Sequence, residues 1–176
     1  ISKLIITGIV AYALLGNFEQ KIKFYLVLTV FFIFMFLAFS GIEAYNEVRI
    51  PGVLQRIGIV YFFTSLVYIK TEIKGQIITI ALLLFGYWAI MTLIPVPDFG
   101  PANLDKGTNL AGWIDNLLLE NHLWASSKTW DPEGILSTIP AIASGIVGLL
   151  VGQLLNSNLT KNDKAVKMFG IGFVLV

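Results

Sequence analysis

The sequence predicts an all-α integral membrane protein, a polytopic helix bundle with about six spans. Of its 176 residues, 56% are hydrophobic and only 13% are charged, whereas about a quarter are charged in soluble domains. The mean hydropathy is +0.80. Several apolar runs approach the ~20 residues that cross the hydrocarbon core of a bilayer. Only a helix satisfies the backbone of a single span in lipid, which predicts the fold class.

Six apolar segments are the predicted spans, within one transmembrane domain over residues 1–176. In chain order they are Leu4–Leu15, Phe24–Ile42, Val53–Ile69, Gln76–Ile94, Ile135–Leu155 and a last segment from about Ala165. The chain begins at Ile1 and ends at Val176 within apolar runs. We therefore expect a fragment of a longer membrane protein, with its first and last spans incomplete.

The net charge and the cysteine and histidine content limit the kinds of chemistry and the binding partners that the chain can have. The net charge is +1 and no basic run is present, so the lipid bilayer and not nucleic acid is the predicted partner. A homo-oligomer is possible. The absence of cysteine excludes disulfides and thiolate chemistry. Because His122 is the single histidine, we also expect no metal site.

Basic residues orient the predicted bundle. The connections after spans one, three and five carry Lys21, Lys23, Lys70, Lys74, Lys161, Lys164 and Lys167. The opposite side carries fewer, namely Arg49, Arg56, Lys106 and Lys128. The positive-inside rule therefore places the Arg49–Arg56 segment and the loop at 95–133 on the outer face.

The connection at 95–133 is predicted to be an ordered loop. Structureless loops longer than ~15 residues are uncommon in compact domains, and this one contains three tryptophans. Apolar residues at helical spacing predict a short amphipathic helix over Leu110–Leu119, lying on the outer end of the bundle. Asn109 is its expected N-cap.

The residues around the fifth span are typical of a helix start. Asp131 suits an N-cap, Pro132 the first helical position and Glu133 the positive helix N-terminus. Glu133 is also a candidate site residue that faces the arginines. Further along, Pro140 is expected to kink the helix and free a carbonyl, which Ser137 and Thr138 are placed to satisfy.

Small residues recur along the same span. Two series have the spacing of close helix packing, Ser137/Ala141/Gly145 and Ser144/Gly148/Gly152. Packing is the favoured interpretation of both series. The lining of a ligand tunnel is the alternative.

Polar residues at these span ends form the candidate substrate-binding set: Arg49, Gln55, Arg56, Asp131 and Glu133. Charge at the edge of a membrane helix costs free energy, so it usually has a partner or a function. Arginines can bind a phosphate or carboxylate through two parallel hydrogen bonds.

Each arginine also has a structural interpretation. The histidine has one functional and one structural interpretation. Arg49 is long enough to reach lipid headgroups. Arg56 has four candidate ion-pair partners, Glu43, Glu47, Asp131 and Glu133. His122 is a candidate general base, although a lone loop histidine is more often a surface or hydrogen-bonding residue.

The order of the motifs resembles the heparan-α-glucosaminide N-acetyltransferase family and its bacterial relatives. The motifs are RIPGVLQR at Arg49–Arg56, AGWID at Ala111–Asp115, HLW at His122–Trp124 and DPEGILST at Asp131–Thr138. The resemblance covers about Val48 to Leu155, and Ile1–Glu47 does not align with it.

This resemblance implies an integral membrane acyltransferase. Such enzymes take acetyl from acetyl-CoA on the cytoplasmic side and pass it to the amino group of a glucosamine-type sugar on the outer or luminal side. The catalytic histidine of the family lies in an Asn-His setting in an earlier span, and nothing in Ile1–Glu47 matches it. The role does not carry over to His122, so the catalytic residue of this chain is unknown. Arg56 and Gln55 are candidate donors to the oxyanion of acyl transfer.

Two functions of other classes also fit the sequence. A transporter of a small sugar or anion would use the fifth span and the outer pocket. It predicts inverted repeats, which the sequence does not show. A non-catalytic membrane scaffold is the second alternative.

Overall fold

The computed structural model describes residues 2–43, 45 and 47–174. Ile1 and Val176, on which the fragment expectation rests, lie outside them. The described residues form seven α-helices and one short 3-10 helix. In this part of the chain β structure is limited to an isolated bridge between Val96 and Gly100. The predicted all-α fold class is confirmed.

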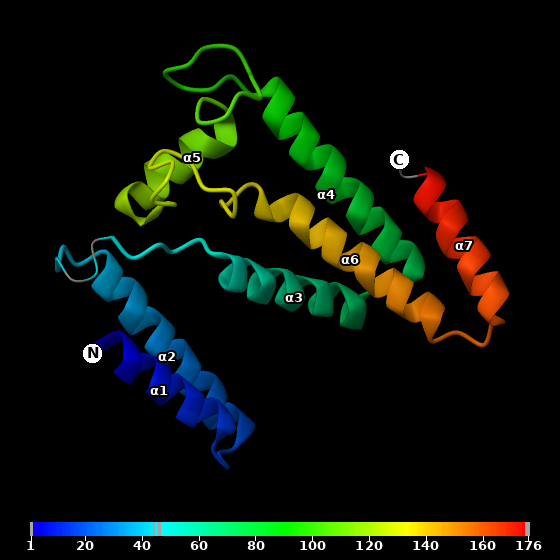
Figure 1. Cartoon of the computed structure of the whole chain (residues 1–176), viewed down its shortest axis with the longest axis horizontal. Helices are drawn as coiled ribbons and strands as arrows, with labels where there is room; N and C mark the ends of the chain where they lie inside the picture. The colour runs from blue at the N-terminus through cyan, green and yellow to red at the C-terminus, as the bar shows by residue number, and fades with distance from the viewer. Residues whose placement is uncertain (1, 44, 46, 175–176) are drawn as a thin grey trace. The chain divides into compact units, whose positions relative to one another are not determined.

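The chain divides into two compact units, Ile1–Val48 and Arg49–Val176. The first unit contains α1 (Ser2–Leu15) and α2 (Gln20–Ala38), which pack side by side as a hairpin (Figure 1). Gly16 ends α1, and its N–H donates to the Tyr12 carbonyl at 2.9 Å. A Cβ atom at Gly16 would lie 2.8 Å from that carbonyl oxygen, so the turn requires glycine. The prediction of a single domain stays a prediction.

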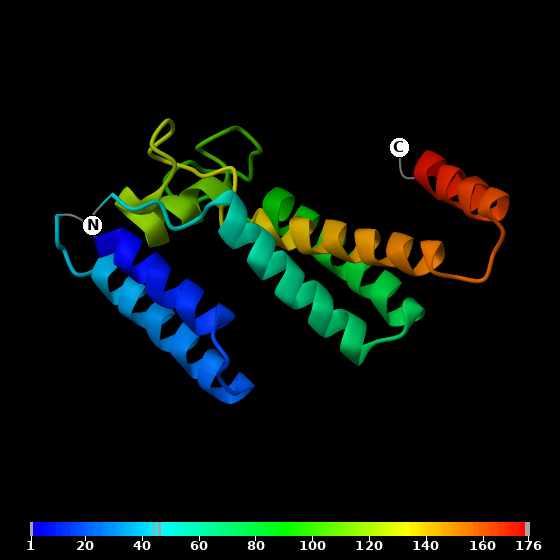
Figure 2. The same cartoon turned by 60° about the horizontal axis from the view of Figure 1, so that its bottom comes forward.

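The second unit contains α3 (Val53–Lys70), α4 (Ile73–Leu93), α5 (Leu110–Leu119), α6 (Thr138–Leu155) and α7 (Lys161–Val174). α6 packs against both α3 and α4. α3 and α6 run in the same direction and α4 runs opposite to them (Figures 1 and 2). The start of α3, the end of α4 and the start of α6 therefore lie at one end of the unit. This brings the arginine motif and the 95–133 loop to the same end, as predicted.

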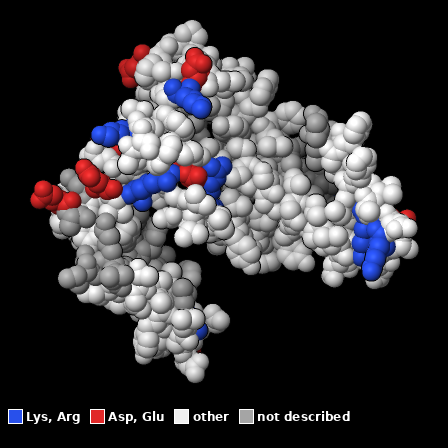
Figure 3. Space-filling view, in the orientation of Figure 1, with Lys and Arg blue, Asp and Glu red and all other residues white. Residues whose placement is uncertain are grey.

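Four of the described helices, α2, α3, α4 and α6, are long and apolar enough to cross a membrane. The predicted first and last spans correspond to α1 and α7, which have 14 residues each. The spanning helices expose large apolar side chains, such as Phe85 at 71% and Trp88 at 60%. Charged residues gather over the loop end of the second unit and over α7, whereas the surface between them is uncharged in this view (Figure 3). The protein is an integral membrane protein.

A small apolar core fixes α5 to the end of α4. Met91, Val96 and Leu110 are buried and pack against partly buried neighbours that include Trp113 and Leu136. α5 has the predicted bounds. The N-cap prediction is also confirmed, because Asn109 Oδ1 accepts a hydrogen bond from the Gly112 N–H at 2.9 Å.

The prediction that Asp131 caps the fifth span is wrong. α6 begins at Thr138, with Ser137 in the cap position, so neither Asp131 nor Pro132 belongs to the helix start. Pro140 is consequently the third residue of α6. In the first turn a missing N–H breaks no bond within the helix, so the expected kink has no cause. The hydroxyls of Ser137 and Thr138 donate to the Gly134 carbonyl at 3.0 and 2.8 Å.

Helix packing in the second unit depends on Gly145. A Cβ atom there would lie 2.6 Å from Thr64 Oγ1 and 2.7 Å from Val60 Cγ1, both on α3. In contrast, a Cβ placed on Gly148 or Gly152 meets no described atom within 4 Å apart from the backbone of its own helix. The packing role of small residues is therefore confirmed at Gly145. At the other end of the unit Gln153 Nε2 on α6 donates to Gln76 Oε1 on α4 at 2.9 Å, and Gln76 is 2% exposed.

Candidate functional site

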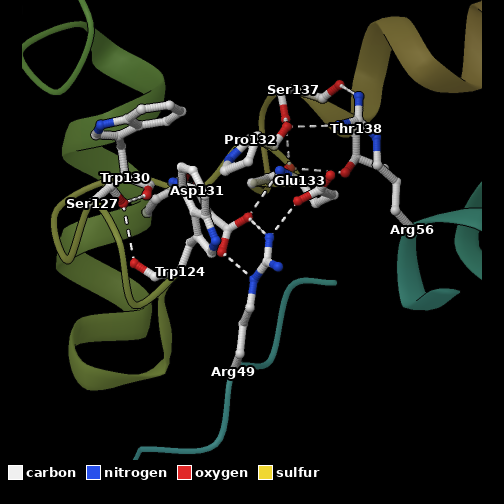
Figure 4. Close-up of polar contacts among 12 residues, drawn as sticks. Arg49, Arg56, Trp124, Ser127, Trp130, Asp131, Pro132, Glu133, Ser137 and Thr138 are labelled. Atoms are coloured by element: carbon white, nitrogen blue, oxygen red, sulfur yellow. Dashed lines mark hydrogen bonds and ion pairs between the residues drawn. The ribbon is translucent and has the colours of Figure 1, made fainter. Parts of the chain in front are cut away.

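Arg49 forms ion pairs with both acidic residues of the candidate set (Figure 4). Its Nε donates to Asp131 Oδ2 at 2.8 Å, and its Nη2 donates to Asp131 Oδ1 at 2.6 Å. Nη2 also donates to Glu133 Oε2. The side chain of Asp131 is fully buried, whereas those of Arg49 and Glu133 are 31% and 18% exposed. The fork geometry that was a candidate for binding an external anion or a lipid headgroup is thus used by two carboxylates of the protein.

Local backbone contacts hold the two sides of this ion pair. Arg49 lies in the extended segment before α3, where the Ile50 N–H donates to the His122 carbonyl at 3.0 Å. On the other side, Asp131 Oδ1 accepts from the Glu133 N–H at 2.9 Å, which is an Asx-type turn. The hydrogen bonding of Arg49 to the carboxylate of Asp131 is the largest cause that raises the pKa of Arg49 above its usual value. Arg49 therefore stays charged at every accessible pH.

Arg56 binds backbone carbonyls and not carboxylates. Its Nη1 donates to the Pro132 carbonyl at 2.8 Å, and its Nη2 donates to the Ser137 carbonyl at 2.6 Å. The ion pair that was the structural interpretation of Arg56 is therefore not formed within the residues that the structure describes. The two bonds tie the start of α3 to the segment before α6. They use only part of the donor capacity of a guanidinium.

Gln55 lies on the first turn of α3 and is exposed. Its side chain folds back over the start of the helix, so a Cβ atom on Gly52 would lie 2.6 Å from Gln55 Oε1. Gly52 is the cap residue of α3, and a side chain there would displace the flexible end of Gln55. Among the described residues, Gln55 forms no hydrogen bond to Arg49 or Arg56.

A groove of about 700 Å³ lies between α3 and α6. Most of its lining is apolar, and Arg56 is its charged member. The lining residues are Val53, Arg56, Ile57, Val60, Tyr61, Thr64, Pro140, Ala141, Ser144 and Gly145. Thr64 Oγ1 is buried and has no hydrogen-bond partner within the described residues. The groove adds an apolar space next to the guanidinium of Arg56.

Comparison with known proteins gives a consistent result. No family model matches the chain. The human heparan-alpha-glucosaminide N-acetyltransferase is 31% identical to it, and the mouse protein of the same name is 30% identical. The predicted family resemblance is confirmed. Each alignment covers 65% of this chain, and the chain spans 24% of the length of either N-acetyltransferase.

The AGWID segment quoted for the N-acetyltransferase resemblance contains a residue that the candidate set missed. Asp115 is 1% exposed, and its Oδ1 accepts from the Ile135 N–H at 2.9 Å. Burial is the main cause that raises the pKa of Asp115, against the lowering effect of its backbone hydrogen bonds. The sequence contains no signal that marks it. The structure buries Asp115 with Gly112 and Leu119, whereas Leu117 and Leu118, which belong to the apolar spacing of this helix, are exposed.

His122 is buried at 4% exposure, within the 3-10 helix Glu120–His122. The structure places its backbone beside the arginine segment, because its carbonyl accepts from Ile50. The site thus brings together Arg49, Asp131 and Glu133, and Arg56 binds the same loop through the Pro132 carbonyl. Gln55 precedes Arg56 on α3, and no hydrogen bond links it to this set among the described residues.

Proposed function

We propose that the full-length protein is a membrane N-acetyltransferase. It passes acetyl from acetyl-CoA to the amino group of a glucosamine-type sugar. The observation that carries the proposal is the contact between the motif at Arg49–Arg56 and the motif at Asp131–Thr138. Arg49 binds Asp131 and Glu133 although 82 and 84 residues separate them in the sequence. The similarity to two N-acetyltransferases supports the reaction class.

We assign the acceptor side of the reaction to Arg49, Gln55, Arg56, Asp131 and Glu133. Glu133 is the more exposed of the two carboxylates, with 18% of its side chain accessible against none for Asp131. It is therefore the group that accepts hydrogen bonds from the sugar or orients its amine. Arg49 and the buried Asp131 hold Glu133 in place through the shared guanidinium.

Arg56 and Gln55 serve the acyl group in this proposal. Acyl transfer develops negative charge on the carbonyl oxygen, and a positioned N–H donor stabilises that charge. Arg56 lines the groove and retains donor capacity beyond its two carbonyl bonds. Gln55 is exposed at the adjacent helix start. The base that takes the proton of the amine is not assigned to any residue of this chain.

We further propose that the arginine motif and the 95–133 loop face outward from the bacterial inner membrane. Their position at one end of the second unit supports a common side. The lysine count supports the outer assignment. Acetyl-CoA would then be used from the opposite, cytoplasmic face.

A vesicle assay tests the function. The full-length protein is reconstituted, labelled acetyl-CoA is supplied on one face and glucosamine on the other. We expect label in N-acetylated sugar. Sugar that crosses unmodified would contradict the proposal in favour of a transporter. A result with no acetylation and no transport would contradict the proposal in favour of a scaffold.

A further inference from the structure

Asp115 is a buried carboxylate held by backbone groups. In the part of the chain that the structure describes it has no ion-pair partner, although it is 1% exposed. Its partners are the N–H groups of Ile135, at 2.9 Å, and Asp131, at 3.4 Å. A buried unpaired charge is costly unless hydrogen bonds compensate it. Its retention in the wall of a candidate site therefore requires an explanation.

The two N–H groups bracket the loop that carries the acidic site residues. Asp131 begins this loop and Ile135 ends it, with Glu133 between them. Gly134 packs directly on the carboxylate, because a Cβ atom on Gly134 would overlap the oxygens of Asp115. The loop is thus wrapped around one side chain of α5, and its path depends on that side chain.

The same loop presents its acidic side chains to Arg49. Asp131 Oδ1 accepts from the Glu133 N–H at 2.9 Å and from Arg49 Nη2 at 2.6 Å. A displacement of the loop backbone therefore moves both carboxylates relative to the guanidinium. Asp115 itself lies across the loop backbone and does not bond to Arg49.

We propose that Asp115 is a positioning residue, which fixes the Asp131–Ile135 loop and so sets the place of Asp131 and Glu133 in the acceptor site. Its link to activity rests on the proposed function. Its link to the ion pair rests on geometry alone. The two links can therefore be tested separately.

The activity test uses the full-length protein and three variants. Asp115→Asn keeps one oxygen acceptor, Asp115→Leu keeps only volume, and Gly134→Ala displaces the carboxylate without altering it. We expect kcat/KM for glucosamine, per folded protein, to fall about tenfold in Asp115→Asn and further in the other two. The KM for acetyl-CoA should stay unchanged, since the loop serves the acceptor. Glu120→Gln, an exposed carboxylate that follows α5, is the matched control.

A purely structural role would lower the amount of folded protein and leave the folded remainder with wild-type kcat/KM. That result would overturn the positioning role. A KM for acetyl-CoA that rises as much as the KM for glucosamine would also overturn it. Should Asp115→Leu fail to fold, Asp115→Asn and Gly134→Ala decide the matter.

A thermal unfolding cycle tests the geometry without activity. We expect the Tm losses of Asp115→Asn and Arg49→Met to be less than additive in the double variant, since both act through one loop. Fully additive losses would overturn the inference. If the wild-type protein acetylates no amino sugar, the proposed function fails, and this cycle still decides whether Asp115 positions the loop.

Discussion

Arg49 and Asp131 form a two-bond ion pair across 82 residues of sequence, and the side chain of Asp131 is completely buried in it. Removing one partner of such a pair leaves an uncompensated buried charge, which costs about 3–5 kcal/mol. We therefore expect Arg49→Met to lower the Tm of the purified protein strongly. Lys106→Met, which removes an exposed cation, is the control. Equal Tm values for the two variants would show that the pair does not hold the fold.

Arg56→Ala tests the second arginine. If its guanidinium stabilises the acyl oxyanion, its loss should lower kcat about 100-fold or more while the amount of folded protein is unchanged. Arg56→Lys retains the charge and loses the planar fork that reaches Pro132 and Ser137. Acetyl transfer by the full-length variants is the measurement. Loss of folded protein in Arg56→Ala would instead assign Arg56 to tying α3 to α6.

Gly145→Ala tests the close approach of α3 and α6. The added methyl would lie 2.6 Å from Thr64 Oγ1, an overlap that we expect to cost about 1–3 kcal/mol. Gly148→Ala, in the same helix, meets no described atom within 4 Å outside the backbone of its own helix and should be neutral or slightly stabilising. Thermal unfolding of the two variants in one detergent makes the comparison. A more stable Gly145→Ala variant would contradict the packing.

The raised pKa of Asp115 makes a prediction about pH. Burial raises the folded-state pKa of Asp115 above the ordinary 3.8. Between these two pKa values the folded protein keeps the carboxyl proton that the unfolded chain has released. The contribution of Asp115 to the free energy of unfolding is therefore fully present below the unfolded-state pKa, and it is lost as pH rises through the folded-state pKa.

The difference in Tm between the wild type and Asp115→Asn isolates this effect, because Asp131 and Arg49 are present in both proteins. We expect the wild type to lose stability relative to the variant as pH rises from below 3.8. A difference in Tm that grows in favour of the wild type over that range would have the wrong sign.

Local patterns in the sequence were sufficient where local contacts decide the structure. The helix Leu110–Leu119 and its cap Asn109 were predicted because the apolar spacing and the cap lie within one short segment. Asp131 shows the limit of such patterns. The sequence Asp-Pro-Glu is a good helix start, but the carboxylate of Asp131 binds a distant arginine and α6 starts later, at Thr138.

Asp115 could not be assigned from the sequence for a related reason. The apolar spacing of α5 does not mark Asp115, because the helix buries Asp115 while Leu117 and Leu118 are exposed. Its partners are backbone N–H groups of another loop, which no side-chain pattern reveals. An ion pair with a carboxylate was one of the two interpretations of Arg56, and the side chain instead binds two carbonyls of the irregular segment before α6. In both cases a tertiary contact with the backbone decides what the side chain binds.

The central claim is that the two motifs form one acceptor site, and Glu133→Gln tests it most directly. The measurement is steady-state acetyl transfer to glucosamine by the full-length protein, beside Glu120→Gln as the control. We expect Glu133→Gln to lower kcat/KM for glucosamine at least about tenfold, with the KM for acetyl-CoA and the folded amount unchanged. A Glu133→Gln enzyme as active as the control would contradict the claim.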